Sequence, residues 1–143
     1  MLSEEGRKVK QGLENLNQLK RKLRNLQEEL KSWQSLDGAV KSASFEQHVS
    51  GGEVVPFAER RLIKIEELKE LISKCIDDAI EKEDQFLREI ENLDALSQNL
   101  LMERYMTGKS LKRIIREFNY SERQIYRLYD NAFENIGKNE RWQ

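Results

Sequence analysis

Apolar residues that recur every seven positions dominate the first two thirds of the chain, and this spacing narrows its possible folds more than any other feature. Between residues 3 and 36 two interleaved series have the spacing: Val9, Leu16, Leu23 and Leu30, and Leu19, Leu26 and Trp33. Between residues 57 and 93 it returns in Ala58, Ile65, Ile72, Ala79, Phe86 and Leu93, interleaved with Leu62, Ile76 and Ile90. This pattern predicts two long helices, each burying one apolar stripe against another helix.

Both long helices need a partner for their stripes, because at about 1.5 Å per residue the second is roughly 50 Å long. Either the first helix folds back on the second as an antiparallel hairpin, or a second chain supplies the partner, which leaves open a homodimer through these helices. Lys69 and Glu83 take polar positions in the predicted seam, where such residues fix register or oligomeric state. Residues 37–56 contain three glycines and the only proline, so they are predicted to connect the two helices.

The last third of the chain changes to shorter helices with strong start and stop signals. Asp94 is placed to cap a leucine-rich helix that Gly108 ends in a left-handed conformation. Ser110 is placed to cap the next helix, which has an apolar face. Asn119 follows that helix, and asparagine tolerates a positive φ better than most residues, so a tight turn is predicted there.

A capping box opens the final helix. In Ser121-x-x-Gln124 the serine hydroxyl accepts from the backbone N–H of the glutamine, whose side chain reaches back to the serine. The helix then places apolar residues at three- and four-residue spacing: Ile125, Leu128, Ala132 and Ile136. Two short helices, a tight turn and a capped second helix predict a helix-turn-helix.

The predicted fold is therefore all-α, with a long, coiled-coil-like antiparallel helical hairpin followed by a C-terminal helix-turn-helix. Its segments are the N-terminal amphipathic helix over 1–36, the connection over 37–56, the long amphipathic helix over 57–92, the helix-turn-helix domain over 93–137 and a tail over 138–143.

Charge is unevenly distributed along the chain although the net charge is only −1. Residues 104–129 contain seven Lys and Arg against two Asp and Glu, whereas residues 53–103 contain seven against fourteen. A local excess of positive charge on short helices is typical of a nucleic-acid-binding surface. The same count also fits an ordinary solvated helix face, so charge alone leaves both interpretations open.

The last third of the chain resembles region 4 of sigma factors. In that pattern a leucine-rich helix ends in Arg-Tyr, and a glycine precedes the two helices of the motif; here these residues are Arg104-Tyr105 and Gly108. The sequence departs from the pattern at Ile115, which replaces a small residue, and at Asn119, which replaces the turn glycine. In its whole layout the chain is similar to small regulators encoded by phages and prophages of Gram-positive bacteria, related to late-transcription regulators of the RinA and ArpU type.

The resemblance implies a sequence-specific transcription regulator that binds double-stranded DNA and acts with host RNA polymerase at a promoter. In this docking mode the start of the second helix enters the major groove. The residues expected to contact bases are Glu122, Arg123, Tyr126 and Arg127. The residues expected to contact the DNA backbone are Lys109, Lys112, Arg113, Arg116, Ser121 and Gln124.

No set of residues favours catalysis, a metal or a cofactor. The single histidine, His48, lies in the predicted connection, and the single cysteine, Cys75, lies beside the long-helix seam, where a buried apolar role is expected. One cysteine is typical of a reducing compartment, and no apolar run approaches the length of a membrane span. We therefore expect a cytoplasmic protein that is not an enzyme and does not bind a membrane.

Two other functions remain open at the level of sequence. A terminase small subunit, which packages DNA, also joins a helix-turn-helix to oligomerisation helices, although there the DNA-binding part usually comes first. A coiled-coil protein whose basic helices bind another protein would not need DNA as a partner.

Overall fold

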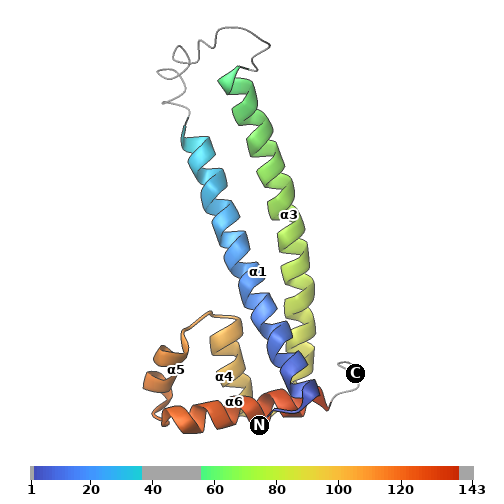
Figure 1. The fold of residues 1–143 in the computed structure, drawn as a ribbon, viewed down its shortest axis with the longest axis vertical. Helices are drawn as coiled ribbons and strands as arrows, with labels where there is room; N and C mark the ends of the chain where they lie inside the picture. Colours follow the sequence, from blue (N-terminus) through green and yellow to red (C-terminus); the bar gives the residue numbers. More distant parts are fainter. Residues whose placement is uncertain (1, 37–55, 139–143) are drawn as a thin grey trace. The chain divides into compact units, whose positions relative to one another are not determined.

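The computed structural model describes residues 2–36 and 56–138, and this part of the chain is entirely helical, with no strand. Its five helices are α1 (Glu4–Ser35), α3 (Phe57–Ile90), α4 (Ala95–Tyr105), α5 (Leu111–Phe118) and α6 (Glu122–Gly137) (Figure 1). The all-α prediction is confirmed. The predicted connection, apart from Pro56, and the tail, apart from Lys138, lie outside the described residues.

The described residues form two compact units that do not follow the predicted segments. The terminal unit comprises the described residues of 1–19 and 79–143, and the middle unit comprises those of 20–78. The terminal unit therefore combines the start of α1 and the end of α3 with α4, α5 and α6. The boundary predicted at residue 93 marks where helices end and begin, whereas the compact unit extends across it.

In the middle unit the end of α1 contacts the start of α3. The rings of Trp33 and Phe57 stack with their centroids 6.5 Å apart. The Arg61 side chain donates from Nε to the Trp33 carbonyl at 2.9 Å and from Nη2 to the Gln34 carbonyl at 3.2 Å. These contacts close the carboxyl end of α1, which carries no basic residue in its last turn, with an arginine from α3.

The predicted seam of α3 is wrong at two members of its second series, Leu62 and Ile76, whereas the third member, Ile90, is buried as predicted. Ile65 and Ile72 are buried as expected, but Leu62 and Ile76 are 57% and 36% exposed. After Ile65 and Ile72 the next buried position is three residues further along the helix rather than four, at Leu68 and Cys75. In a helix, the residues three and four positions after a given residue lie on opposite flanks of the apolar stripe. Both flanks of α3 carry aliphatic residues.

Lys69 consequently lies beside the seam rather than in it. Its side chain is 53% exposed and pairs with Glu66 of the same helix at 3.7 Å. Cys75 is buried, as predicted, and takes one of the positions three residues on. Lys69, which was expected to fix the register from within the apolar stripe, is thus a solvated residue beside the stripe. The Cys75 thiol occupies a buried position of the stripe.

The core of the terminal unit is built by five helices. Its buried members are Val9, Leu13 and Leu16 of α1, Phe86 and Ile90 of α3, Leu100, Leu101 and Tyr105 of α4, Ile114 of α5, and Ile125, Tyr129, Ala132, Phe133 and Ile136 of α6. The Tyr105 ring meets Phe86 and Phe133 edge to face, with centroids 6.4 Å away in each case. Tyr105 and Tyr129 are both buried in this core.

The start of α1 lies directly on the end of α6. A Cβ at Gly6 would lie 2.6 Å from Glu134 Oε1, and a Cβ at Gly137 would lie 3.1 Å from the backbone carbonyl carbon of Glu5. The Ser3 hydroxyl donates to Glu134 Oε2 at 2.7 Å and accepts from the Gly6 backbone N–H at 3.1 Å. Two glycines and one carboxylate therefore fix the beginning of α1 on α6.

Candidate nucleic-acid interface

The helix α4 that precedes the candidate interface begins at a strong cap and ends at Tyr105, three residues before a glycine. Asp94 accepts from the Ser97 backbone N–H at 3.2 Å and from the Ser97 hydroxyl at 2.7 Å. These bonds, the hydroxyl bond above all, lower the pKa of the Asp94 carboxyl. After α4, Gly108 adopts a φ of 78°, and the Lys109 N–H donates to the Glu103 carbonyl at 3.0 Å. The predicted cap and the left-handed glycine are both confirmed.

The two helices that follow are joined by a three-residue turn, 119–121. Ser110 caps α5 by accepting from the Arg113 backbone N–H at 3.2 Å. Asn119 ends α5 with φ 57° and ψ 29°, the left-handed region in which asparagine is tolerated. Both features confirm the sequence predictions.

Ser121 and Gln124 form the predicted capping box at the start of α6. The Gln124 backbone N–H donates to the Ser121 hydroxyl at 3.1 Å, and the Ser121 backbone N–H donates to Gln124 Oε1 at 2.9 Å. The two side-chain oxygens are thus engaged in the cap. Contact of these residues with DNA, which the sequence analysis predicts, would use the serine hydroxyl hydrogen and the glutamine amide hydrogens.

The residues predicted to contact bases lie on the solvent side of α6. Glu122, Arg123 and Arg127 are exposed, and the Tyr126 side chain is 48% exposed. The opposite face of the helix is buried, with Ile125 at 0%. The arginines lie four residues apart and so one helical turn from each other.

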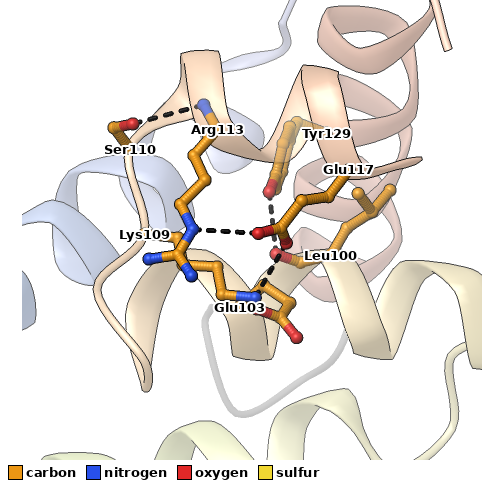
Figure 2. A network of polar contacts seen from close by, with 7 residues as sticks. All are labelled: Leu100, Glu103, Lys109, Ser110, Arg113, Glu117 and Tyr129. Atoms are coloured by element: carbon orange, nitrogen blue, oxygen red, sulfur yellow. Dashed lines mark hydrogen bonds and ion pairs between the residues drawn. The ribbon is translucent and has the colours of Figure 1, made fainter. Parts of the chain in front are cut away.

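The four cations predicted on and before α5 fall into two groups. Lys112 and Arg116 are exposed, lie four residues apart and form no ion pair within the described part of the chain. Lys109 and Arg113 instead point toward Glu117 (Figure 2). Lys109 Nζ lies 2.8 Å from Glu117 Oε2, and Arg113 Nε lies 2.9 Å from Oε1.

Lys109 has a second partner on α4, because its ammonium also pairs with Glu103. Only 16% of the Lys109 side chain is exposed, compared with 59% of the Arg113 side chain. The hydrogen bond that Lys109 donates to Glu103, followed by the one it donates to Glu117, raises the pKa of Lys109. The bonds from Lys109 and then Arg113 lower the pKa of Glu117. Lys109 therefore links α4 to α5 through two carboxylates.

Glu117 belongs to this surface, although it is not among the site residues predicted from the sequence. Arg113 and Glu117 are four residues apart on one helix, so their pairing was visible in the sequence as a general tendency. The contact of Lys109 with Glu117 had no comparable signal in the sequence, because it depends on how residues 106–110, which join α4 to α5, are folded.

Residues of α1 also border the candidate interface, and sequence reasoning assigned them to a separate segment. A cleft of about 230 Å³ lies beside Tyr126 and Asp130 of α6, and Lys10 and Glu14 of α1 line it together with residues of α4 and α5. No signal in the sequence relates these positions, which are more than a hundred residues apart.

No cluster of three or more His, Cys, Asp or Glu side chains placed to hold a metal ion occurs among the residues that the structure describes. Within the same residues, no helix is long and apolar enough to cross a membrane. His48 lies outside the described residues. Comparison with family models, with curated proteins and with solved structures gave no match to this chain.

Proposed function

We propose that α4, α5 and α6 form a helix-turn-helix unit that binds double-stranded DNA, with α6 as the recognition helix in the major groove. One observation carries the proposal: a three-residue turn with a left-handed Asn119 leads into the capped α6, which buries Ile125 and exposes Arg123 and Arg127. A tight turn and an exposed basic start of the second helix are what insertion into a major groove requires.

In this proposal α6 reads the sequence and α5 fixes the position of the unit. Arg123 and Arg127 donate to guanine O6 and N7, and Glu122 accepts from a cytosine amino group. Tyr126 contacts a thymine methyl group or the backbone. Lys112 and Arg116 neutralise phosphates without reading bases, as cations on the helix preceding a recognition helix commonly do.

The chain as a whole is proposed to be a sequence-specific transcription regulator of the kind that the sigma region 4 resemblance implies, with host RNA polymerase as its further partner. We also propose that α1 and α3 pair as an antiparallel, coiled-coil-like hairpin. The contacts of Trp33 and Arg61 within the middle unit support this pairing.

Selection of bound duplexes from a random DNA pool with the full chain tests the proposal. The selected duplexes should share a motif, and Arg127→Ala or Arg123→Ala should weaken binding to it by about 1–3 kcal/mol while relaxing preference at one position. Lys112→Ala should weaken binding to all duplexes about equally. Lys74→Ala, which removes an exposed cation of the middle unit, is the matched control and should change neither property. Failure to enrich any motif, or to bind DNA at low salt, would contradict the proposal.

A further inference from the structure

The Glu117 carboxylate is bound in the way that a phosphate group is bound by basic side chains. Each of its two oxygens accepts from a different cation, Oε2 from Lys109 at 2.8 Å and Oε1 from Arg113 at 2.9 Å (Figure 2). Charged N–H donors on separate oxygens of one anion are the usual arrangement at phosphate sites in DNA-binding proteins. Both cations were predicted from the sequence to contact phosphate.

This anion site lies at the surface and not in the core. The Glu117 side chain is 37% exposed and that of Arg113 is 59% exposed. Lys112 and Arg116 belong to the same short helix, α5, and are also exposed. A DNA backbone that contacts Lys112 and Arg116 would therefore pass the helix that holds the Glu117 site.

We infer that Glu117 takes the place of a DNA phosphate on Arg113 and Lys109, and so limits the affinity of this surface for DNA of any sequence. The inference rests on the proposed function. A carboxylate attached to the same helix is always within reach of Arg113, so a phosphate has to compete with an intramolecular partner. Lys109 is even less available to a phosphate than Arg113, because it also pairs with Glu103.

The consequence concerns the electrostatic part of binding. Sequence-independent affinity comes from phosphate contacts, and each contact adds about 0.9 to the slope of log K against log salt concentration. While Glu117 occupies Arg113, this arginine does not contribute a phosphate contact. Lys112 and Arg116 then provide the phosphate contacts of α5. Discrimination between sequences stays with α6, which does not touch Glu117 in the described contacts.

The test is a salt titration of Glu117→Gln in the full chain, with the selected duplex and an unrelated duplex of equal length. The variant should bind both duplexes several-fold more tightly at low salt, by the same factor. Its slope should be steeper by about 0.9, since Arg113 becomes available while Glu103 still holds Lys109. An unchanged slope would overturn the inference while leaving the proposed function intact, whereas absence of DNA binding by the unaltered chain would overturn both.

Two further variants separate release of Arg113 from simple loss of a negative charge. Arg113→Gln in the Glu117→Gln background should return the slope to that of the unaltered chain. Arg113→Gln alone should leave the slope unchanged, because Arg113 is already paired. A shallower slope for this single variant would show that Arg113 contacts phosphate in spite of Glu117, and would overturn the inference whether or not Glu117→Gln folds. Circular dichroism of each variant checks the helical content.

Discussion

At the scale of single residues, Tyr129 shows how the candidate recognition helix is held. Its ring lies in the core and stacks against Phe133, with centroids 6.1 Å apart. Its hydroxyl donates to the Leu100 carbonyl of α4 at 2.7 Å, as Figure 2 shows. Burial raises the pKa of the Tyr129 hydroxyl above its ordinary value of 10, so the hydroxyl is a neutral donor at neutral pH. One buried hydrogen bond thus joins α6 to α4.

Tyr129→Phe should lower the free energy of unfolding by about 1 kcal/mol. The ring and its packing remain, but one buried hydrogen bond is lost, and such a bond typically contributes 0.5–1.5 kcal/mol. Urea denaturation followed by circular dichroism measures the change. Tyr126→Phe removes a hydroxyl from an exposed ring of the same helix and should leave the stability unaltered. Equal stability of both variants would show that the bond to Leu100 contributes nothing.

Ser121→Ala should lower the free energy of unfolding by about 1 kcal/mol, since it removes the acceptor for the Gln124 backbone N–H at the start of α6. Ser110→Ala, which removes the equivalent acceptor at the start of α5, should cost a similar amount. The unfolding midpoint in urea measures both. If either variant matches the unaltered chain, the corresponding helix start does not depend on its cap.

At the scale of helices, the contact between α1 and α6 determines where α6, the candidate recognition helix, can lie. Gly6 and Gly137 allow the two helices to approach closely, and Glu134 binds Ser3 at the start of α1. A glycine inside a helix normally lowers its stability relative to alanine. At Gly137 the close approach of the Glu5 backbone supplies the physical reason for glycine, whereas the atoms nearest to Gly6 belong to side chains.

Gly137→Ala should destabilise the protein by about 1–3 kcal/mol, because the new Cβ would lie 3.1 Å from the Glu5 backbone, which cannot move as a side chain can. Asn135→Ala, at an exposed position of the same helix, is the control and should have little effect. Thermal unfolding followed by circular dichroism compares the two. A Gly137→Ala variant that is more stable than the unaltered chain would mean that α1 is not held at this crossing.

The Glu134 contact also predicts a dependence on pH. The bonds from the Ser3 backbone N–H and hydroxyl lower the pKa of Glu134 in the folded protein. The stabilisation is therefore fully present above the pKa of the unfolded chain, about 4.5, and is lost as the pH falls through the lower folded pKa. The urea midpoint of the unaltered chain should decrease between pH 5 and pH 3, roughly the interval around that pKa. Glu134→Gln should show a smaller decrease, and an identical decrease would contradict the assignment.

At the scale of the whole molecule, the unit that carries the candidate interface is built from both ends of the described chain. Val9, Leu13 and Leu16 of α1 belong to the same core as α4, α5 and α6. Burying one such side chain contributes about 1.5–3 kcal/mol. Three of them together match the lower part of the usual stability of a domain, about 5–15 kcal/mol.

A fragment of residues 79–138 should consequently fail to unfold cooperatively on heating, although it contains every residue assigned to DNA contact. Adding a peptide of residues 2–19 should restore a cooperative transition, because it returns the missing part of the core. The same peptide with Leu13 and Leu16 replaced by serine is the control and should not restore it. Cooperative unfolding of the fragment alone would show that α1 is dispensable for the fold.

The sequence by itself determined the features that depend on neighbours within about four residues. Ser110 and Ser121 begin helices, and Asn119 takes the left-handed conformation, because these choices follow from the chemistry of each side chain and its own backbone. The three- and four-residue spacing of apolar residues likewise determined that the described part of the chain is helical. The all-α class and the helix starts were predicted on this basis.

Only the tertiary structure decided which of several locally equivalent options is used. Either flank of the α3 stripe is apolar enough to be buried, and packing selects Leu68 and Cys75. Nothing in the sequence distinguishes Lys109 from the other cations near α5. The fold of the segment between α4 and α5 brings it to Glu117. The physical reason is the same in both cases: local chemistry is equally satisfied by each option, so the free energy difference comes from contacts between residues that the chain brings together only when it folds.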